Sequence, residues 1–132
     1  MKTLKVVAAI IENDSSVLAT QRGYGELKDK WEFPGGKIEV GETPEKALER
    51  EISEELNLSI DVGDCLTTVE YDYPDYHLSM QCFICRIRDG SLILKEHKSA
   101  RWLTVDDLWS VDWLPADIKV VEIIGERWPS RI

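Results

Sequence analysis

Short apolar runs separated by polar turns occupy the first third of the chain. Val6 to Ile11 is apolar and β-branched at four of its six positions, a composition typical of a buried strand. After a polar turn, Val17 to Arg22 is again apolar in character, and the two runs together predict a hairpin. Trp31-Glu32-Phe33 predicts a further short strand, which we expect to stop at a turn over Pro34-Gly35-Gly36.

Residues 43–57 carry the start and stop signals of a helix. Thr43 offers a hydroxyl cap, and Pro44 suits the first helical position because its missing N–H would have no partner there. Asn57 can adopt the left-handed conformation that ends a helix after Leu56. A tight turn over Glu39-Val40-Gly41 is expected just before, so the helix follows two glycine-containing turns.

The second half of the chain carries more strand patterns. Residues 60–73 contain alternating and apolar pieces typical of one or two strands, and a turn at Pro74-Asp75 leads into a long strand from His77 to Arg88. Asp89-Gly90 is a strong hairpin signal, so a returning strand is predicted over residues 92–94. A short strand is also predicted over residues 100–103.

Two further helices are indicated near the carboxyl terminus. Thr104 can cap a short helix that begins at Val105, and Pro115 can open a last helix that ends near Trp128. The apolar stripe predicted for this last helix is Ile118, Val121, Ile123 and Ile124. Because the first strands are too apolar to face water, we expect an α+β fold with helices on both faces of a mixed sheet.

Length and charge narrow the class of protein. The 132 residues fit one domain spanning 1–132, and 43% hydrophobic with 31% charged residues is typical of a soluble globular chain. A net charge of −9 argues against a nucleic-acid polymer or an anionic membrane as partner, since both are polyanions. A small phosphorylated ligand stays compatible, because a bound metal can invert the local charge.

Cysteine usage indicates a reducing compartment. The chain has three cysteines and no signal-peptide pattern, so we expect free thiols and a cytoplasmic location. Cys82 and Cys85 have the spacing of a metal or redox motif, but they lie in a predicted strand among apolar neighbours. Buried strand thiols are therefore the favoured interpretation, with a metal or redox role as the alternative.

Acidic residues are concentrated in and before the predicted helix. Between Glu39 and Glu55 there are seven glutamates and two basic residues, Lys46 and Arg50. At 100° per residue, Glu51, Glu54 and Glu55 fall within one arc of about 100° beside the apolar stripe of the helix. One interpretation is a solvated helix in which Arg50 pairs with Glu54. The other is a site for a hard cation, Mg²⁺ or Mn²⁺, together with a phosphorylated ligand.

The same residues resemble a known signature. In the Nudix hydrolase family it reads G-x5-E-x7-R-E-U-x-E-E-x-G-U, where U is a bulky aliphatic residue. It is filled in register by Gly36, Glu42, Arg50, Glu51, Ile52, Glu54, Glu55 and Leu58. Asn57 replaces the last glycine, a small departure because Asn also tolerates the left-handed cap. The Q-R-G, W-E-F-P-G-G-K and P-A-D-I segments resemble the MutT-like branch, nearest to its CTP or 5-substituted-dCTP pyrophosphohydrolases.

The resemblance implies a fold and a metal site. The family fold is an α/β/α sandwich around a mixed β-sheet. Glu51, Glu54 and Glu55 resemble the metal ligands, with a backbone carbonyl near Gly36, and Mg²⁺ or Mn²⁺ is the implied cofactor. Arg50 resembles the residue that orients a helix glutamate. Glu96 occupies the place of a further acid that binds metal or helps to activate water; an ordinary charged loop is the alternative.

The resemblance also suggests residues that contact substrate. Arg22 lies where relatives contact phosphate, although a surface arginine at a strand end would look the same. Asp117 could read the base, with a simple helix-start acid as the alternative. Phe33, Tyr73 and His77, together with Tyr76, are candidate stacking or wall residues, and aromatic residues on strands are more often core.

The implied reaction is hydrolysis of a nucleoside triphosphate to a monophosphate and pyrophosphate, cleansing the nucleotide pool of modified nucleotides. Cytosine nucleotides and 8-oxo-dGTP are the expected substrates. A sugar nucleotide or dinucleotide hydrolase is one alternative, and a non-catalytic ligand sensor is another. The sequence leaves open the number of metals, whether Glu96 or a signature glutamate is the general base, and whether the protein is a monomer or a homodimer.

Overall fold

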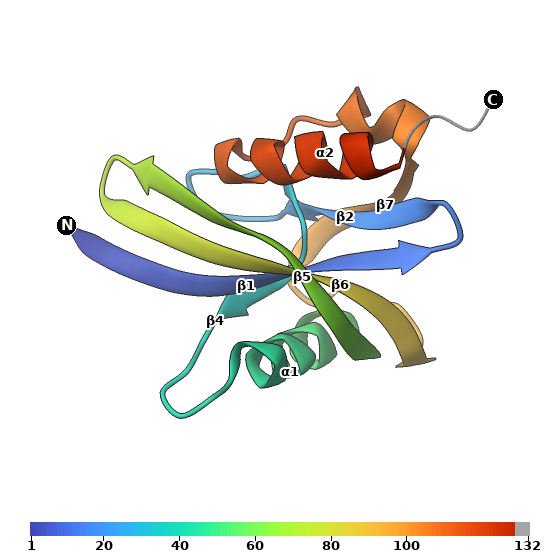
Figure 1. The fold of residues 1–132 in the computed structure, drawn as a ribbon, viewed down its shortest axis with the longest axis horizontal. Coiled ribbons are helices and arrows are strands. Elements are labelled where there is room, and N and C mark those ends of the chain that lie inside the picture. Colours follow the sequence, from blue (N-terminus) through green and yellow to red (C-terminus); the bar gives the residue numbers. More distant parts are fainter. Residues whose placement is uncertain (129–132) are drawn as a thin grey trace.

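One mixed sheet lies between two helices in the computed structural model, which describes residues 1–128 (Figure 1). The strands are β1 (Lys2–Asn13), β2 (Ser16–Arg22), β3 (Trp31–Glu32), β4 (Gly35–Lys37), β5 (Leu58–Tyr73), β6 (Tyr76–Gly90) and β7 (His97–Thr104). The helices are α1 (Pro44–Leu56), the 3-10 helix η1 (Val105–Ser110) and α2 (Pro115–Arg127). This is the predicted α+β sandwich, with α1 and α2 on opposite faces.

Strand pairing makes β1 the centre of the sheet. The order is β3-β2-β1-β6-β5, while β4 also pairs with β1 and β7 with β2. β1 and β6 run parallel, with Lys2 to Ile11 beside Tyr76 to Cys85, and the other pairs are antiparallel. Because β2 and β4 both pair with β1, the sheet divides beside α1, and the site described below lies near this division.

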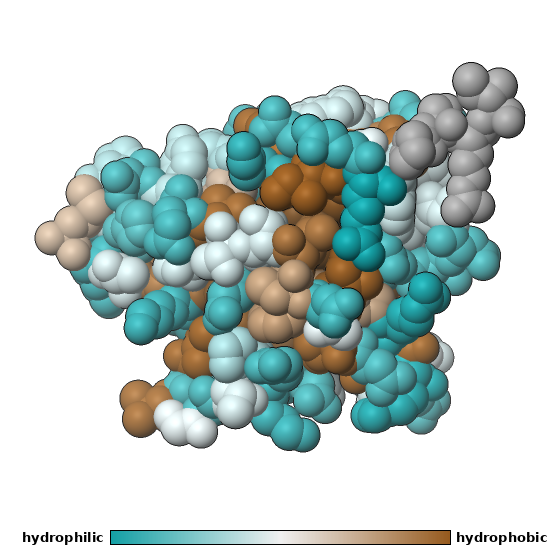
Figure 2. Space-filling view, in the orientation of Figure 1, coloured by the Kyte–Doolittle hydropathy of each residue, from teal (hydrophilic) through white to brown (hydrophobic). Residues whose placement is uncertain are grey.

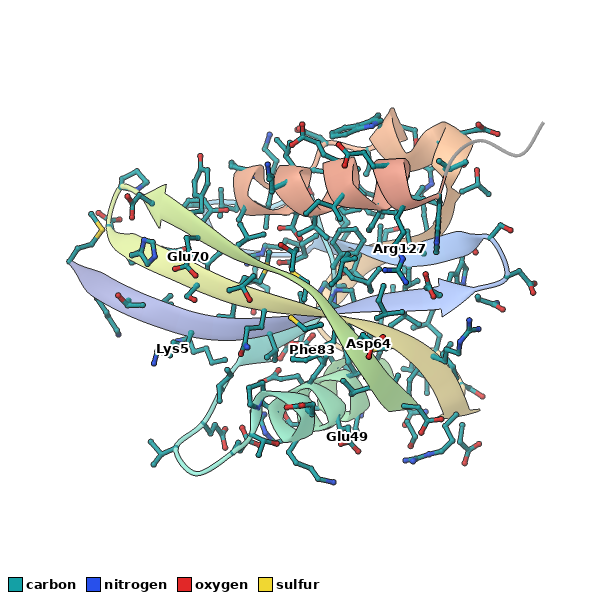
Figure 3. The ribbon with its side chains drawn as sticks, viewed as in Figure 1. Lys5, Glu49, Asp64, Glu70, Phe83 and Arg127 are labelled. Atoms are coloured by element: carbon teal, nitrogen blue, oxygen red, sulfur yellow. The ribbon has the colours of Figure 1, made fainter. Side chains whose placement is uncertain are left out.

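Alternation along the strands produces two separate cores. On β1, Val7, Ala9 and Ile11 pack with α1, whereas Ala8 and Ile10 pack with α2. Figure 3 shows Phe83 of β6 between the sheet and α1, in agreement with its place in the first of these cores. Burial on both faces explains why the strand sequences are nearly continuous apolar runs.

The predicted boundaries of α1 are confirmed. The Thr43 side chain accepts a hydrogen bond from the Lys46 N–H, and Asn57 has φ 59°, so both caps form as expected. Cys82 and Cys85 are buried strand thiols, as the favoured interpretation stated, and Cys65 is exposed.

Three local predictions are wrong. Gly35 and Gly36 belong to strand β4 and pair with Ala8 and Val7 instead of forming a turn. Residues 92–94 form no strand; Gly90 ends β6 with φ 103°, and the chain then turns back to α1. Ile118, which was predicted to belong to the apolar stripe of the last helix, is 40% exposed.

α2 buries a different set of side chains from the one predicted. Its buried residues are Ala116, Asp117, Val120, Val121 and Ile124, so the buried face is rotated toward Asp117. In Figure 2 hydrophilic residues occupy most of the margin, and hydrophobic atoms reach the surface in a strip beneath α2. Within the described residues, no helix is long and apolar enough to cross a membrane.

Candidate active site

The helix glutamates differ in their exposure. Glu55 is 9% exposed, and the Glu51 side chain is 16% exposed. The Glu54 side chain is 61% exposed and contacts only Arg50 among the described residues. The acidic arc predicted from helical geometry is therefore real, but it runs from solvent at Glu54 into the interior at Glu55.

Strand β4 comes unusually close to this arc. A Cβ added to Gly36 would lie 2.4 Å from the carboxyl carbon of Glu51, and one on Gly35 would lie 1.9 Å from the Val7 carbonyl oxygen. A side chain at Gly35 would overlap the Val7 backbone, and one at Gly36 would displace the end of the Glu51 side chain, so the two glycines serve close approach and not a turn. The backbone at Gly36 therefore meets the Glu51 carboxylate directly.

Arg50 is the centre of an ion-pair network. Its Nε donates to Glu42 at 2.7 Å, and its Nη1 donates to Glu51 at 2.9 Å and to Glu54 at 3.3 Å. Its Nη2 also donates to the Lys37 carbonyl oxygen at 3.1 Å. Hydrogen bonds from Arg50 and from the Glu39 N–H lower the pKa of Glu42 to about 2. Arg50 thus holds two helix glutamates, Glu42 and strand β4 in one arrangement.

Glu55 is a buried acid with a carboxylate oxygen that lacks a hydrogen-bond partner among the described residues. That oxygen, Oε2, is itself buried. Burial, followed by the nearby Glu51, Glu96 and Glu32 carboxyls, raises the pKa of Glu55 to about 9. A positive charge at this point would offset the crowding, and a divalent cation is the group that takes several carboxylate oxygens.

The α1 carboxylates are groups that bind metals, but their oxygens do not point to one common position. Within residues 1–128 no three His, Cys, Asp or Glu side chains are already arranged as a metal site. Arg50 occupies one Glu51 oxygen and one Glu54 oxygen, whereas the unpaired Glu55 Oε2 has no such competitor. The chemistry of the donor set therefore fits a hard cation, with Glu55 as the buried ligand.

A cavity of about 370 Å³ extends from Glu55 to α2. Its charged and polar lining comprises Arg22, Tyr24, Glu32, Lys37, Glu55, Tyr73, Tyr76, Glu96, His97 and Asp117. Gly35, Gly36 and Phe33 complete the wall beside β4. Acids of α1 and of α2, from opposite faces of the sheet, therefore line the same open cavity.

Asp117 is the polar group of the α2 end. It is 3% exposed, and its Oδ1 accepts the Phe33 N–H at 3.0 Å. Burial is the main reason that the pKa of Asp117 rises to about 8. At neutral pH this carboxyl is therefore mostly protonated, and it can donate one hydrogen bond as well as accept others.

Aromatic rings shape the same end. Phe33 stacks on Trp113 with ring centroids 4.7 Å apart, and Tyr73 stacks on Tyr76 at 5.2 Å. The Tyr73 hydroxyl accepts the Ala116 N–H at 3.3 Å, which ties β5 to the start of α2. These contacts fix the walls on either side of Asp117.

The structure brings most predicted site residues together. Arg22, Phe33, Gly36, Glu55, Tyr73, Glu96 and Asp117 line the cavity. Glu51 lies against Gly36, while Glu54 and Arg50 lie just outside. His77 does not line the cavity, because alternation on β6 turns Tyr76 and Leu78 toward it and His77 away. His77 instead contacts Asp72 at 2.6 Å and Glu70 at 2.7 Å.

Sequence reasoning missed Glu32 and His97, and it rated Tyr76 no higher than its neighbours. Glu32 accepts a hydrogen bond from Arg22 Nε at 3.0 Å, and His97 Nε2 lies 3.6 Å from the same Glu32 oxygen, Oε2. Burial opposes ionisation of Glu32, yet His97 and Arg22 hold its pKa below the usual value. The available signal was Glu32 itself, a charge placed between two large aromatic residues.

An acidic helix that supplies carboxylates to a cavity, behind a strand of closely packed glycines, defines a class of hydrolases. The comparison with family models identifies the class: the NUDIX domain matches residues 1–122, and the chain belongs to this family. Nudix hydrolases generally use a divalent metal, which agrees with the donor set described above.

Similar proteins include two curated enzymes of Escherichia coli strain K12. An 8-oxo-dGTP diphosphatase is 33% identical over 123 residues, covering 92% of this chain and 95% of the relative. A CTP pyrophosphohydrolase is 32% identical over 123 residues, covering 92% and 91%. The solution structure of a MutT protein from methicillin-resistant Staphylococcus aureus 252 is 40% identical, with a TM-score of 0.77 and coverage of 96% and 99%.

Proposed function

We propose that this chain hydrolyses nucleoside triphosphates, including modified ones, to the monophosphate and pyrophosphate, with Mg²⁺ or Mn²⁺ as cofactor. One observation carries the proposal: a single cavity extends from the α1 carboxylate Glu55 to the buried carboxyl of Asp117. A nucleotide has the same division, with a charged phosphate chain at one end and a flat polar base at the other. We also propose that residues 1–132 form one Nudix domain.

The phosphate end is assigned to α1 and β4. Glu51, Glu54 and Glu55, with a backbone carbonyl near Gly36, would hold the divalent cation. Bound there, the cation would lower the pKa of water and offset charge that develops on the phosphate oxygens. Arg50 would act by orienting Glu51 and Glu54, since it contacts both of them.

Arg22 and Glu96 are assigned to the phosphate chain and to proton transfer. The Arg22 Nε is bound to Glu32, so its two terminal nitrogens can bind phosphate oxygens from the cavity wall. Glu96 lines the cavity close enough to Glu55 to raise its pKa. Either Glu96 or a signature glutamate can accept a proton from the attacking water.

The base end is assigned to Asp117, Phe33 and Tyr73. An ionised Asp117 can accept from the exocyclic amine of cytosine, whereas a protonated one can also donate to an oxidised purine. Because the pKa of Asp117 is about 8, both forms exist near neutral pH. The relatives named for 8-oxo-dGTP and for CTP support these two substrate classes.

Release of pyrophosphate from a panel of triphosphates tests the proposal. The panel includes CTP, 5-methyl-dCTP, 5-hydroxy-dCTP, 8-oxo-dGTP and dGTP, with Mg²⁺ or Mn²⁺, and reports kcat/KM. We expect the monophosphate and pyrophosphate as products and a preference for the cytosine or oxidised nucleotides. A dinucleotide and a sugar nucleotide belong in the same panel, and higher kcat/KM on either of them would overturn the proposal.

A further inference from the structure

Three strands bring Arg22, Glu32 and His97 together at one point of the cavity wall. Arg22 is the last residue of β2, Glu32 the last of β3, and His97 the first of β7. In the β2–β7 pair Arg22 lies opposite His97, across an irregularity in the register after Gln21. Such irregularities redirect side chains, and here the side chains of Arg22 and His97 both reach one partly buried acid, Glu32.

The backbone around this point is closely packed. A Cβ added to Gly23, directly after Arg22, would lie 3.0 Å from the Glu96 carbonyl oxygen. The Glu96–His97 backbone is therefore held against the end of β2. The position of His97 relative to Arg22 is consequently fixed by main-chain contacts and does not depend on side-chain pairing alone.

Among residues 1–128 the His97 side chain has one polar contact, with Glu32. Its side chain is 8% exposed, Nε2 lies 3.6 Å from Glu32 Oε2, and Nδ1 is buried without a hydrogen-bond partner among the described residues. A carboxylate can only accept, so Nε2 is the nitrogen that carries a proton toward Glu32. Burying the unpaired Nδ1 costs free energy. Packing alone therefore does not account for a histidine at this position.

Glu32 contacts Arg22 as well as His97. The same oxygen, Oε2, accepts from Arg22 Nε at 3.0 Å. The two terminal nitrogens of Arg22 make no hydrogen bond within residues 1–128, and the side chain is 40% exposed on the cavity wall. The direction of the guanidinium is thus set by Glu32, and the direction of Glu32 is set in part by His97.

We propose that His97 is a positioning residue that fixes Glu32, and through it aims Arg22 at the phosphate chain of the substrate. This inference rests on the proposed function, because it assigns Arg22 to a phosphate. His97 also lines the cavity, but in this assignment it acts through Glu32 and not by a contact of its own with the phosphate. Its loss therefore weakens substrate binding more than it slows the chemical step.

Steady-state kinetics and binding of three His97 variants test the inference. We expect His97→Ala to raise KM by about tenfold with kcat within about twofold. His97→Gln carries an amide N–H to the place of Nε2 and should restore KM, whereas His97→Asn places its N–H nearer Nδ1 and should not. Calorimetric titration with a non-hydrolysable α,β-methylene triphosphate should give the same ranking of Kd without turnover.

A double-mutant cycle identifies the route of the effect. If His97 acts through Arg22, then His97→Ala in an Arg22→Ala background should change KM by less than about twofold. An unchanged KM in His97→Ala, equal effects of Ala and Gln, or additive effects with Arg22→Ala would each overturn the inference. If His97→Ala does not fold, the Gln-against-Asn comparison decides. An inactive wild-type protein would instead overturn the proposed function.

Discussion

The two ends of the cavity are built in opposite ways. At the α1 end the helix carboxylates and the glycines beside them come from one continuous stretch, Gly35 to Leu58, in which a glycine strand, a turn and a helix follow each other. The α2 end joins distant segments: Phe33 bonds to Asp117, 84 positions away, and Tyr73 bonds to Ala116, 43 positions away. Chemistry that depends on a helix can be inferred from a short segment, whereas substrate choice depends on the completed fold.

The strongest test of the α1 end is Glu54→Gln. The Glu54 side chain is 61% exposed, so its loss should leave the free energy of unfolding within about 0.5 kcal/mol. As a proposed metal ligand, its removal should lower kcat on the order of a thousandfold while nucleotide binding largely survives.

Glu49→Gln is the matched control for Glu54→Gln. Glu49 belongs to the same helix, and Figure 3 shows it on the side of α1 away from the sheet. Both substitutions remove one charge from α1, so full activity of the control together with loss in Glu54→Gln would assign the effect to the site. Wild-type kcat in Glu54→Gln would remove Glu54 from the metal ligands.

Gly36→Ala and Gly35→Ala separate geometry at the site from stability of the sheet. An added methyl group on Gly36 meets the end of the Glu51 side chain, which can move aside, whereas one on Gly35 meets the Val7 backbone. We expect Gly36→Ala to fold and to lose about a hundredfold in kcat, because Glu51 is displaced. Gly35→Ala should lose several degrees of Tm at the least. Thermal unfolding and kcat of both variants decide, and an active Gly36→Ala would contradict the close-approach argument.

Asp117→Asn tests the α2 end by a change of preference. Asn keeps an oxygen for the Phe33 N–H but is never ionised, so it cannot switch between acceptor and donor roles as Asp can. We expect the ratio of kcat/KM for cytosine against 8-oxoguanine triphosphates to change by about ten- to a hundredfold. Asp112→Asn, at an exposed acid that pairs with Lys30, is the control. An unchanged ranking would show that Asp117 does not read the base.

The pH dependence of stability tests the burial of Asp117 directly. The pKa of Asp117 is raised from 3.8 to about 8, so the folded state holds a proton that the unfolded state has released between those values. Stability should therefore decrease as pH rises from about 4 to about 8, by up to about 1.4 kcal/mol per pH unit from this group. Urea denaturation at pH 6, 7 and 8 should show a shallower decrease in Asp117→Asn than in the wild type.

Local signals in the sequence predicted α1 completely. Thr43, Pro44 and Asn57 act on their immediate neighbours, and the structure forms the caps that they specify. The positions of the acids followed from helical geometry for the same reason. The apolar strands and the two-sided covering of the sheet were also predictable, because burial on both faces leaves a nearly unbroken apolar pattern.

Contacts between distant segments account for the errors. Gly35 and Gly36 looked like a turn because glycine permits one, and only the approach of Val7 and Glu51 shows that they are needed in a strand. The His77 side chain points away from the cavity because its neighbour on β6, Tyr76, lines it. Which side chains of a strand face a site cannot be read from the residue types alone. Glu32 was passed over because Arg22 and His97, which compensate its burial, come from other strands.

The segment after β6 limits how this chain can vary. The N–H groups of Ile93 and Lys95 donate to the carbonyl oxygens of Leu56 and Glu55, at the end of α1, and Glu96 follows immediately. The segment acts as a spacer of fixed length between Glu55 and Glu96. An insertion here would displace Glu96 from Glu55. We therefore expect natural changes of loop length in this fold to avoid residues 91–95.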